Sequence, residues 1–146
     1  MLDLSTITTY QSGVTQASAY RVVKRHTAHA LRDYNLSCMQ WFTIGTVLDS
    51  GSEGTRLSDL AVKLDTSLAY MTTTVNLLES RNILTKKAHK YDARTKLITV
   101  SSHYVSVCEE IEVYVRNKLR TLLYDHISHE ELASYVKVLS TISNLK

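Results

Sequence analysis

The sequence of 146 residues contains no proline and only four glycines. Their scarcity disfavours both a turn-rich β-sandwich and a disordered tail. Cysteine is also scarce, with two residues, which argues against a disulfide framework. The sequence lacks a charged-then-apolar leader and an apolar run of about 18 residues, so neither secretion nor a membrane span is expected. We therefore expect a cytoplasmic, mainly helical protein that does not bind membranes.

Apolar residues make up 44% of the sequence, enough to bury one sizeable core. No linker-like stretch divides the chain, so we predict a single domain over residues 1–146. Glycine-rich phosphate loops and the GxSxG and HExxH signatures are absent, and the cluster Glu109, Glu110 and Glu112 is typical of a solvated helix face. The sequence thus predicts a protein that is not an enzyme and needs no cofactor.

The net charge of +3 is unevenly placed. Residues 56–96 contain eight Lys and Arg against four Asp and Glu, which gives +4 and leaves −1 for the rest of the chain. A near-neutral scaffold with one basic segment favours a polyanion as partner. The alternative is a solvated face that is basic by chance.

Helical spacing of apolar residues predicts six helices. Three of them have a serine at the position that caps a helix, and Gln40 completes a capping box with the first of these serines. Trp41, Ile44, Val47 and Leu48 form the predicted buried stripe of the second helix. The predicted helices are residues 5 to about 34, the segment capped by Ser37, residues 57–64, the segment capped by Ser67 that ends near residue 80, the segment capped by Ser101, and residues 128 to the end.

The third and fourth predicted helices are joined by a tight turn at Asp65 and Thr66. In the fourth helix, Met71, Val75 and Leu78 fall within about 60° of one another and mark the core side. Two short helices with such a turn predict a helix-turn-helix, whose second helix exposes small and polar residues. That exposed face and its flanks contain Ala69, Tyr70, Thr72, Thr73 and Asn76.

Two strand-like runs, residues 83–89 and 95–100, flank a polar tip. The guanidinium of Arg94 at this tip can reach into a minor groove, and Asp92 is close enough in sequence to hold its orientation. Four lysines, at positions 86, 87, 90 and 96, should divide between the two faces of the hairpin, so only some can meet phosphate. The hairpin therefore predicts contact with duplex DNA, and an exposed hairpin charge is the alternative for Arg94.

From about residue 36 to residue 101 the chain resembles the MarR family of bacterial winged-helix regulators. The resemblance is carried by LSCMQW, LSDLAVKL, SLAYMTTTVNLLESRNIL, the wing tip DARTK and the strand KLITVS. It implies a winged helix-turn-helix, mainly α with a small β-hairpin wing, in an interlocked homodimer. Residues 1–35 and 102–146 would be the dimerisation helices. The family fold places a recognition helix in the major groove and the wing over the minor groove, and DNA is often released when a small molecule or an oxidant is sensed.

The resemblance and the helical pattern together nominate the DNA-binding residues. Thr72 matches the usual threonine of the recognition helix, and Arg94 matches the wing arginine. The sequence departs from the family at Arg56, where a Ser or Thr cap is usual, and at Asp65 and Asn82, which replace glycines; Asn tolerates the left-handed backbone needed at position 82. The predicted DNA-binding set is Ser67, Ala69, Tyr70, Thr72, Thr73, Asn76, Lys86, Lys90 and Arg94, with Asp92 as the wing-orienting residue.

The ends of the chain are more apolar than a winged core of about 60 residues can cover. Apolar residues recur from Leu132 to Leu145, and Leu2, Leu4 and Ile7 add to them at the other end. We expect this excess to be buried in a homodimer.

Such a regulator could sense its signal in two ways. The first, which we prefer, is the binding of a small-molecule effector. The second is Cys38, because the first position after a helix cap lowers the pKa of a thiol. Cys108 lies on an apolar stripe and should be inert. The six histidines form no metal-binding motif, so no metal site is predicted. A redox-sensing regulator that acts through Cys38, or a helical dimeric adaptor that binds proteins without DNA, are the alternative functions.

Overall fold

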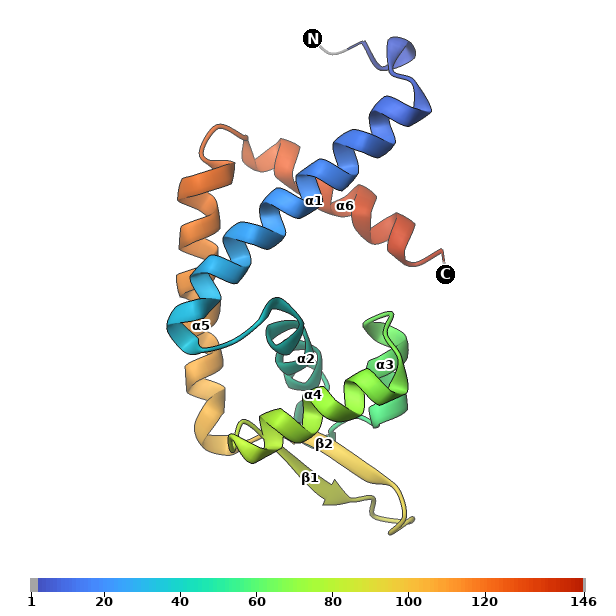
Figure 1. The fold of residues 1–146 in the computed structure, drawn as a ribbon, viewed down its shortest axis with the longest axis vertical. Helices are drawn as coiled ribbons and strands as arrows, with labels where there is room; N and C mark the ends of the chain where they lie inside the picture. The colour runs from blue at the N-terminus through green and yellow to red at the C-terminus, as the bar shows by residue number, and fades with distance from the viewer. Residues whose placement is uncertain (1–2, 146) are drawn as a thin grey trace. The chain divides into compact units, whose positions relative to one another are not determined.

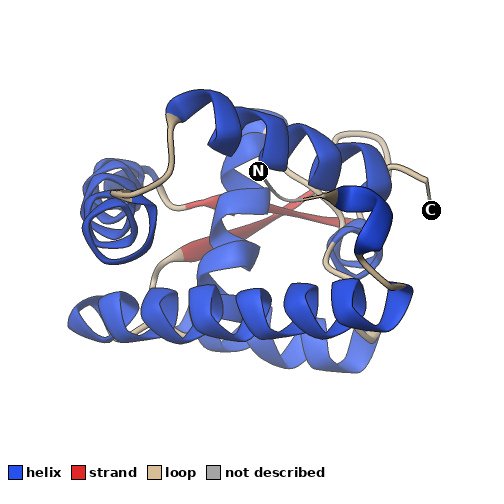
Figure 2. Cartoon of the chain, turned by 90° about the horizontal axis from the view of Figure 1, so that it is seen from above, coloured by secondary structure: helices blue, strands red, loops and turns tan. Residues whose placement is uncertain are grey.

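The computed structural model describes residues 3–145 and is mainly helical, with one antiparallel pair of strands (Figures 1 and 2). This confirms the predicted fold class of a mainly α protein with a small β-hairpin. The chain divides into two compact units, one formed by residues 3–30 and 114–145 and the other by Leu31–Val113. Leu2, which belongs to the dimer prediction, lies outside the described residues.

The unit Leu31–Val113 contains the winged helix-turn-helix. Strand β1 pairs with β2 so that Leu84 faces Val100 and Ala88 faces Lys96, and α4 lies across this hairpin (Figure 1). Thr55 and Ile98 exchange backbone hydrogen bonds at 3.0 and 2.8 Å, which ties the segment before α3 to the hairpin. The elements in order are η2 (Arg32–Tyr34), α2 (Cys38–Asp49), η3 (Gly51–Glu53), α3 (Leu57–Lys63), α4 (Leu68–Ser80), β1 (Leu84–Ala88), β2 (Lys96–Val100), η4 (Ser102–Tyr104) and the first part of α5 (Val105–Leu119).

Two of the three predicted serine caps are confirmed. Ser37 and Gln40 form the predicted capping box of α2, and the Ser67 hydroxyl accepts the Tyr70 amide at 3.1 Å to begin α4. The prediction for Ser101 is wrong, because its buried hydroxyl instead forms a 2.8 Å hydrogen bond with the hydroxyl of Thr85. The chain then passes through η4 before α5 begins.

Non-glycine residues take the left-handed backbone at two positions where the resemblance leads one to expect glycine. Asp65 has φ 53° in the turn between α3 and α4, and Asn82 has φ 58° where the chain leaves α4. Short polar side chains tolerate this conformation, so both turns form without glycine. Arg56 precedes α3 without a side-chain capping bond, as its residue type suggests.

The predicted stripe of α2 is only partly right. Ile44 and Val47 are fully buried, whereas Trp41 and Leu48 are half-buried. Thr43 occupies the core in their place, and its hydroxyl donates to the Met39 carbonyl at 2.7 Å, which satisfies the polar group inside the core. The remaining fully buried side chains of this unit include Leu60, Met71, Val75, Leu78 and Ile98.

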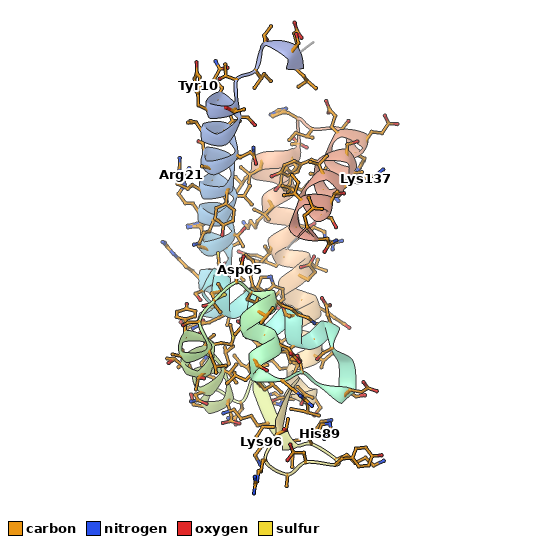
Figure 3. The ribbon with its side chains drawn as sticks, turned by 90° about the vertical axis from the view of Figure 1, so that its right-hand side faces the viewer. Tyr10, Arg21, Asp65, His89, Lys96 and Lys137 are labelled. Atoms are coloured by element: carbon orange, nitrogen blue, oxygen red, sulfur yellow. The ribbon has the colours of Figure 1, made fainter. Side chains whose placement is uncertain are left out.

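The unit of residues 3–30 and 114–145 contains α1 (Thr9–Leu31, of which the last residue belongs to the other unit), the end of α5, the π-helical turn Arg120–Tyr124, and α6 (His129–Ser143). The first helix is shorter than predicted at both ends. Residues 4–6 form a separate 3-10 turn, Ile7 is extended, and Thr8 and Gln11 cap each other to start α1. Tyr10 and Arg21 project from α1 (Figure 3).

Candidate nucleic-acid interface

The two faces of α4 have opposite character, as the sequence predicts. Met71, Val75 and Leu78 are completely buried. On the other side Ala69, Tyr70, Thr73 and Asn76 are exposed, with Thr72 half-buried at the edge. The second helix of the helix-turn-helix therefore presents small and polar groups to solvent, on a backbone anchored by the core.

The threonines of this surface satisfy their own donors. The Thr72 hydroxyl donates to the Leu68 carbonyl at 2.8 Å, and the Thr73 hydroxyl donates to the Ala69 carbonyl at 3.2 Å. Each hydroxyl oxygen still has acceptor capacity, and each methyl group is fixed with it. The surface thus offers acceptors and methyl groups at defined places.

The hairpin tip is held by Asp92. Its carboxylate accepts hydrogen bonds from the Arg94 amide at 3.0 Å and from the Thr95 hydroxyl at 2.8 Å. These two bonds, with the Thr95 contribution the larger, lower the pKa of Asp92. The sequence predicts that Asp92 orients the side chain of Arg94; the hydrogen bond in the structure is to the Arg94 backbone.

The rest of the tip is open to solvent. Tyr91 is 83% exposed, and the Lys90 ammonium lies 5.4 Å from the centre of its ring. The Arg94 side chain is exposed as well. Figure 3 shows His89 and Lys96 on the two sides of the hairpin close to this tip. The tip therefore combines cationic groups with an exposed aromatic ring.

Strand alternation divides the lysines of β1 as predicted. Lys86 turns toward α4, where its ammonium lies 2.6 Å from the Asn76 amide oxygen and 3.5 Å from a Glu79 carboxylate oxygen. Lys87 turns the other way and donates to the Ser52 carbonyl. Lys86, a predicted DNA-binding residue, thus lies against α4, the helix that carries most of the other predicted DNA-binding residues.

Comparison with solved structures decides the fold. A MarR-family transcriptional regulator from Rhodococcus sp. RHA1 has a TM-score of 0.84 at 14% identity, covering 97% of this chain and 98% of its own. CouR from Rhodococcus jostii RHA1, bound to p-coumaroyl-CoA, has a TM-score of 0.79 at 16% identity, with 98% and 96% covered. A mutant of MarR from E. coli, complexed with operator DNA, has a TM-score of 0.76 at 16% identity, with 89% and 91% covered. The chain has the MarR fold. The sequence itself matches no protein-family model and no curated protein.

Within this MarR fold, three exposed apolar side chains of the helix-turn-helix were not predicted. Val62 of α3 is 76% exposed, and Leu68 and Leu77 of α4 are 54% and 46% exposed. Leu68 directly follows the Ser67 cap, so its exposure could have been predicted from its position in the first turn of α4. Apolar groups at such a surface can contact thymine methyl groups.

An open groove of about 620 Å³ runs between the wing and the segment before α3. Its walls carry charges of both signs, with Arg56, Lys87 and Lys90 against Glu53 and Asp59. Because its charges are mixed, this groove is a weaker candidate for a phosphate-binding site than the hairpin tip is.

Both cysteines are buried in the MarR fold. Cys38, the first residue of α2, is 5% exposed, and Cys108 is 1% exposed. Burial raises the pKa of the Cys108 thiol to about 11, which agrees with the predicted inert position. The burial of Cys38 works against the access that a thiol sensor needs.

Within residues 3–145, His, Cys, Asp and Glu form no group of three or more that could hold a metal ion. The helices of the same residues include none with the length and apolar content needed to span a membrane.

Proposed function

We propose that the protein is a sequence-specific DNA-binding transcriptional regulator that binds a pseudo-palindromic operator as a homodimer. The observation that carries the proposal is the pairing, in one compact unit, of the exposed face of α4 with a hairpin tip held by Asp92. A helix of this size fits the major groove, and an arginine on a hairpin suits the adjacent minor groove. The bound operator DNA of the E. coli relative supports this reading.

In this proposal the residues of α4 read bases and those of the wing contact the backbone and minor groove. Ser67 and the first turn of α4 would lie nearest to phosphate, because helix N-termini bind anions. Arg94 would enter the minor groove, and Lys90 would neutralise phosphate. The base-reading candidates are Ala69, Tyr70, Thr72, Thr73 and Asn76.

The homodimer is supported by α6. Among the described residues of this helix none is buried, although it is amphipathic. A second copy of the chain is the simplest cover for such a face, and a two-fold dimer presents two recognition helices to one side of the duplex. Its exposed apolar side chains include Tyr135, Val136, Val138, Leu139 and Ile142.

A small-molecule effector remains our preferred input. CouR, which shares the fold, holds p-coumaroyl-CoA. In this chain the winged unit has a cleft of about 560 Å³, within the usual size range of ligand sites. Val47, Leu48 and Val105 supply apolar walls to this cleft.

The test is selection of duplexes from a random pool with the purified full-length protein, followed by affinity measurements at several salt concentrations. Arg94→Ala should weaken binding to every selected site and flatten the salt dependence by roughly 0.9 for each phosphate that is no longer neutralised. Arg21→Ala removes the same charge from α1 and serves as the matched control. Failure of the wild-type protein to enrich any duplex would rule out the proposed function.

A further inference from the structure

A lysine of the wing contacts the side-chain amide of one residue of the recognition helix, Asn76. Lys86 lies on β1, and its ammonium is 2.6 Å from Oδ1 of Asn76 on α4. The same ammonium is 3.5 Å from Oε1 of Glu79, which stands one helical turn beyond Asn76. One lysine therefore joins the wing to two residues of α4, and its own side chain is 30% exposed.

This contact fixes which end of the amide faces the wing. An ammonium only donates hydrogen bonds, so the atom of Asn76 beside it must be the carbonyl oxygen. The NH₂ group of the amide is then directed away from Lys86. Any further donor that approaches Oδ1 also meets the positive charge of the ammonium, which repels its hydrogen.

The orientation of an asparagine amide matters for base recognition. Asparagine reads adenine with both ends, because it accepts from N6 and donates to N7. Guanine offers only acceptors, O6 and N7, on its major-groove edge. An asparagine whose oxygen is engaged and whose NH₂ group is free therefore matches guanine better than adenine.

We propose that Lys86 is a positioning residue that makes Asn76 select guanine over adenine at one position of each operator half-site. This inference rests on the proposed DNA-binding function. Lys86 acts through Asn76 and needs no contact of its own with the duplex. This positioning role explains why Lys86, which was predicted to contact phosphate, lies against the recognition helix.

The experiment compares the duplexes selected from a random pool by the wild-type protein, Asn76→Ala and Lys86→Met. Asn76→Ala identifies the base pair that Asn76 reads, because in this variant the base preference should disappear at one base pair per half-site. At that position the wild type should prefer guanine. Lys86→Met frees the amide oxygen, so the ratio of adenine to guanine should rise at least about fivefold, the lower bound for one specific contact.

Two further variants separate positioning from simple loss of charge. Lys86→Arg restores a group that only donates, so it should keep the preference for guanine. Lys87→Met removes the neighbouring lysine, which faces the Ser52 carbonyl, and should leave base preference unchanged. The unfolding midpoint of each variant confirms that the protein is folded when it is assayed.

Several results would overturn the inference. An unchanged preference in Lys86→Met would show that Lys86 does not act through Asn76. Uniform weakening with a flatter salt dependence would make Lys86 a phosphate contact. Asn76→Ala without effect at any position would mean that Asn76 reads no base. Absence of duplex binding by the wild type would remove the proposed function itself and this inference with it, a result distinct from the other three.

Discussion

The Asp92 carboxylate accepts a hydrogen bond from the Arg94 backbone amide at 3.0 Å and a second from the Thr95 hydroxyl at 2.8 Å. The Thr95 amide also donates to the Asp92 carbonyl at 3.1 Å. These bonds set the backbone of the tip before any partner arrives. A preformed tip loses less conformational entropy on binding, which favours affinity.

We expect Asp92→Ala to weaken DNA binding although it removes a negative charge near the proposed interface. Without the two carboxylate bonds the tip should take several conformations, at a cost of severalfold in affinity. Asp125→Ala makes the same change of charge in the segment between the π-helical turn Arg120–Tyr124 and α6 and should not weaken binding. Tighter binding by Asp92→Ala would show that only the charge at the tip matters.

The tip should loosen in acid. Hydrogen bonds lower the pKa of Asp92 from its ordinary value of 3.8. A carboxyl with a lowered pKa in the folded state contributes stability above its unfolded pKa, and this stability disappears as the pH falls through the folded pKa. The tip should therefore stay ordered at neutral pH and become disordered only below about pH 4. The amide shift of Arg94, followed by NMR, would report this, and a midpoint above the ordinary aspartate value would contradict it.

Gly54→Ala should destabilise the winged unit. Gly54 has φ 81°, and a Cβ at this position would lie 2.7 Å from the Ile98 carbonyl oxygen. Both the backbone conformation and the pairing of Thr55 with Ile98 resist a side chain here, so we expect a destabilisation of roughly 1–3 kcal/mol. Gly45→Ala is the control, because Gly45 lies inside α2 with open space around it and should gain about 0.5–1 kcal/mol. Chemical denaturation gives the free energy of unfolding of the two variants and of the wild type. A Gly54→Ala protein as stable as the wild type would refute the close approach.

The sequence predicted best those features that depend on neighbours in the chain. Ser37 and Ser67 each lie three positions before the residue whose amide they cap. Asn82 takes the left-handed backbone at the point where the chain leaves α4. The division of α4 into a buried and an exposed face also follows from its own periodicity. Periodicity and capping chemistry are therefore sufficient for the elements and for most of the candidate surface.

Features that depend on residues distant in the chain were missed. Ser101 has the chemistry of a cap, but it bonds to Thr85, which is 16 residues away. Lys86 has the charge of a phosphate contact, but it meets Asn76 and Glu79 across the junction of wing and helix. Such choices between two suitable partners are settled by tertiary packing, which a sequence pattern does not encode.

Thiol chemistry should play no part in DNA binding. At pH 8, with a pKa of about 11, only about one Cys108 side chain in a thousand is a thiolate, and Cys38 is 5% exposed. Mild peroxide should leave the DNA affinity of the wild type and of Cys38→Ser equal and unchanged. Loss of binding in the wild type alone would make the protein an oxidant sensor. Reaction of both thiols with iodoacetamide only after unfolding would agree with their burial.

The oligomeric state should depend on the apolar face of α6. Leu139 is 43% exposed and Ile142 is 56% exposed in the single chain. If a second copy covers them, Leu139→Glu buries an uncompensated carboxylate, which costs several kcal/mol and should give monomers in sedimentation velocity at micromolar concentration. Thr141→Glu adds the same charge about 200° away around the helix and should leave the dimer intact. DNA affinity should fall with the dimer, because a monomer presents one recognition helix where the operator offers two half-sites. A wild-type chain that sediments as a monomer would contradict the dimer directly.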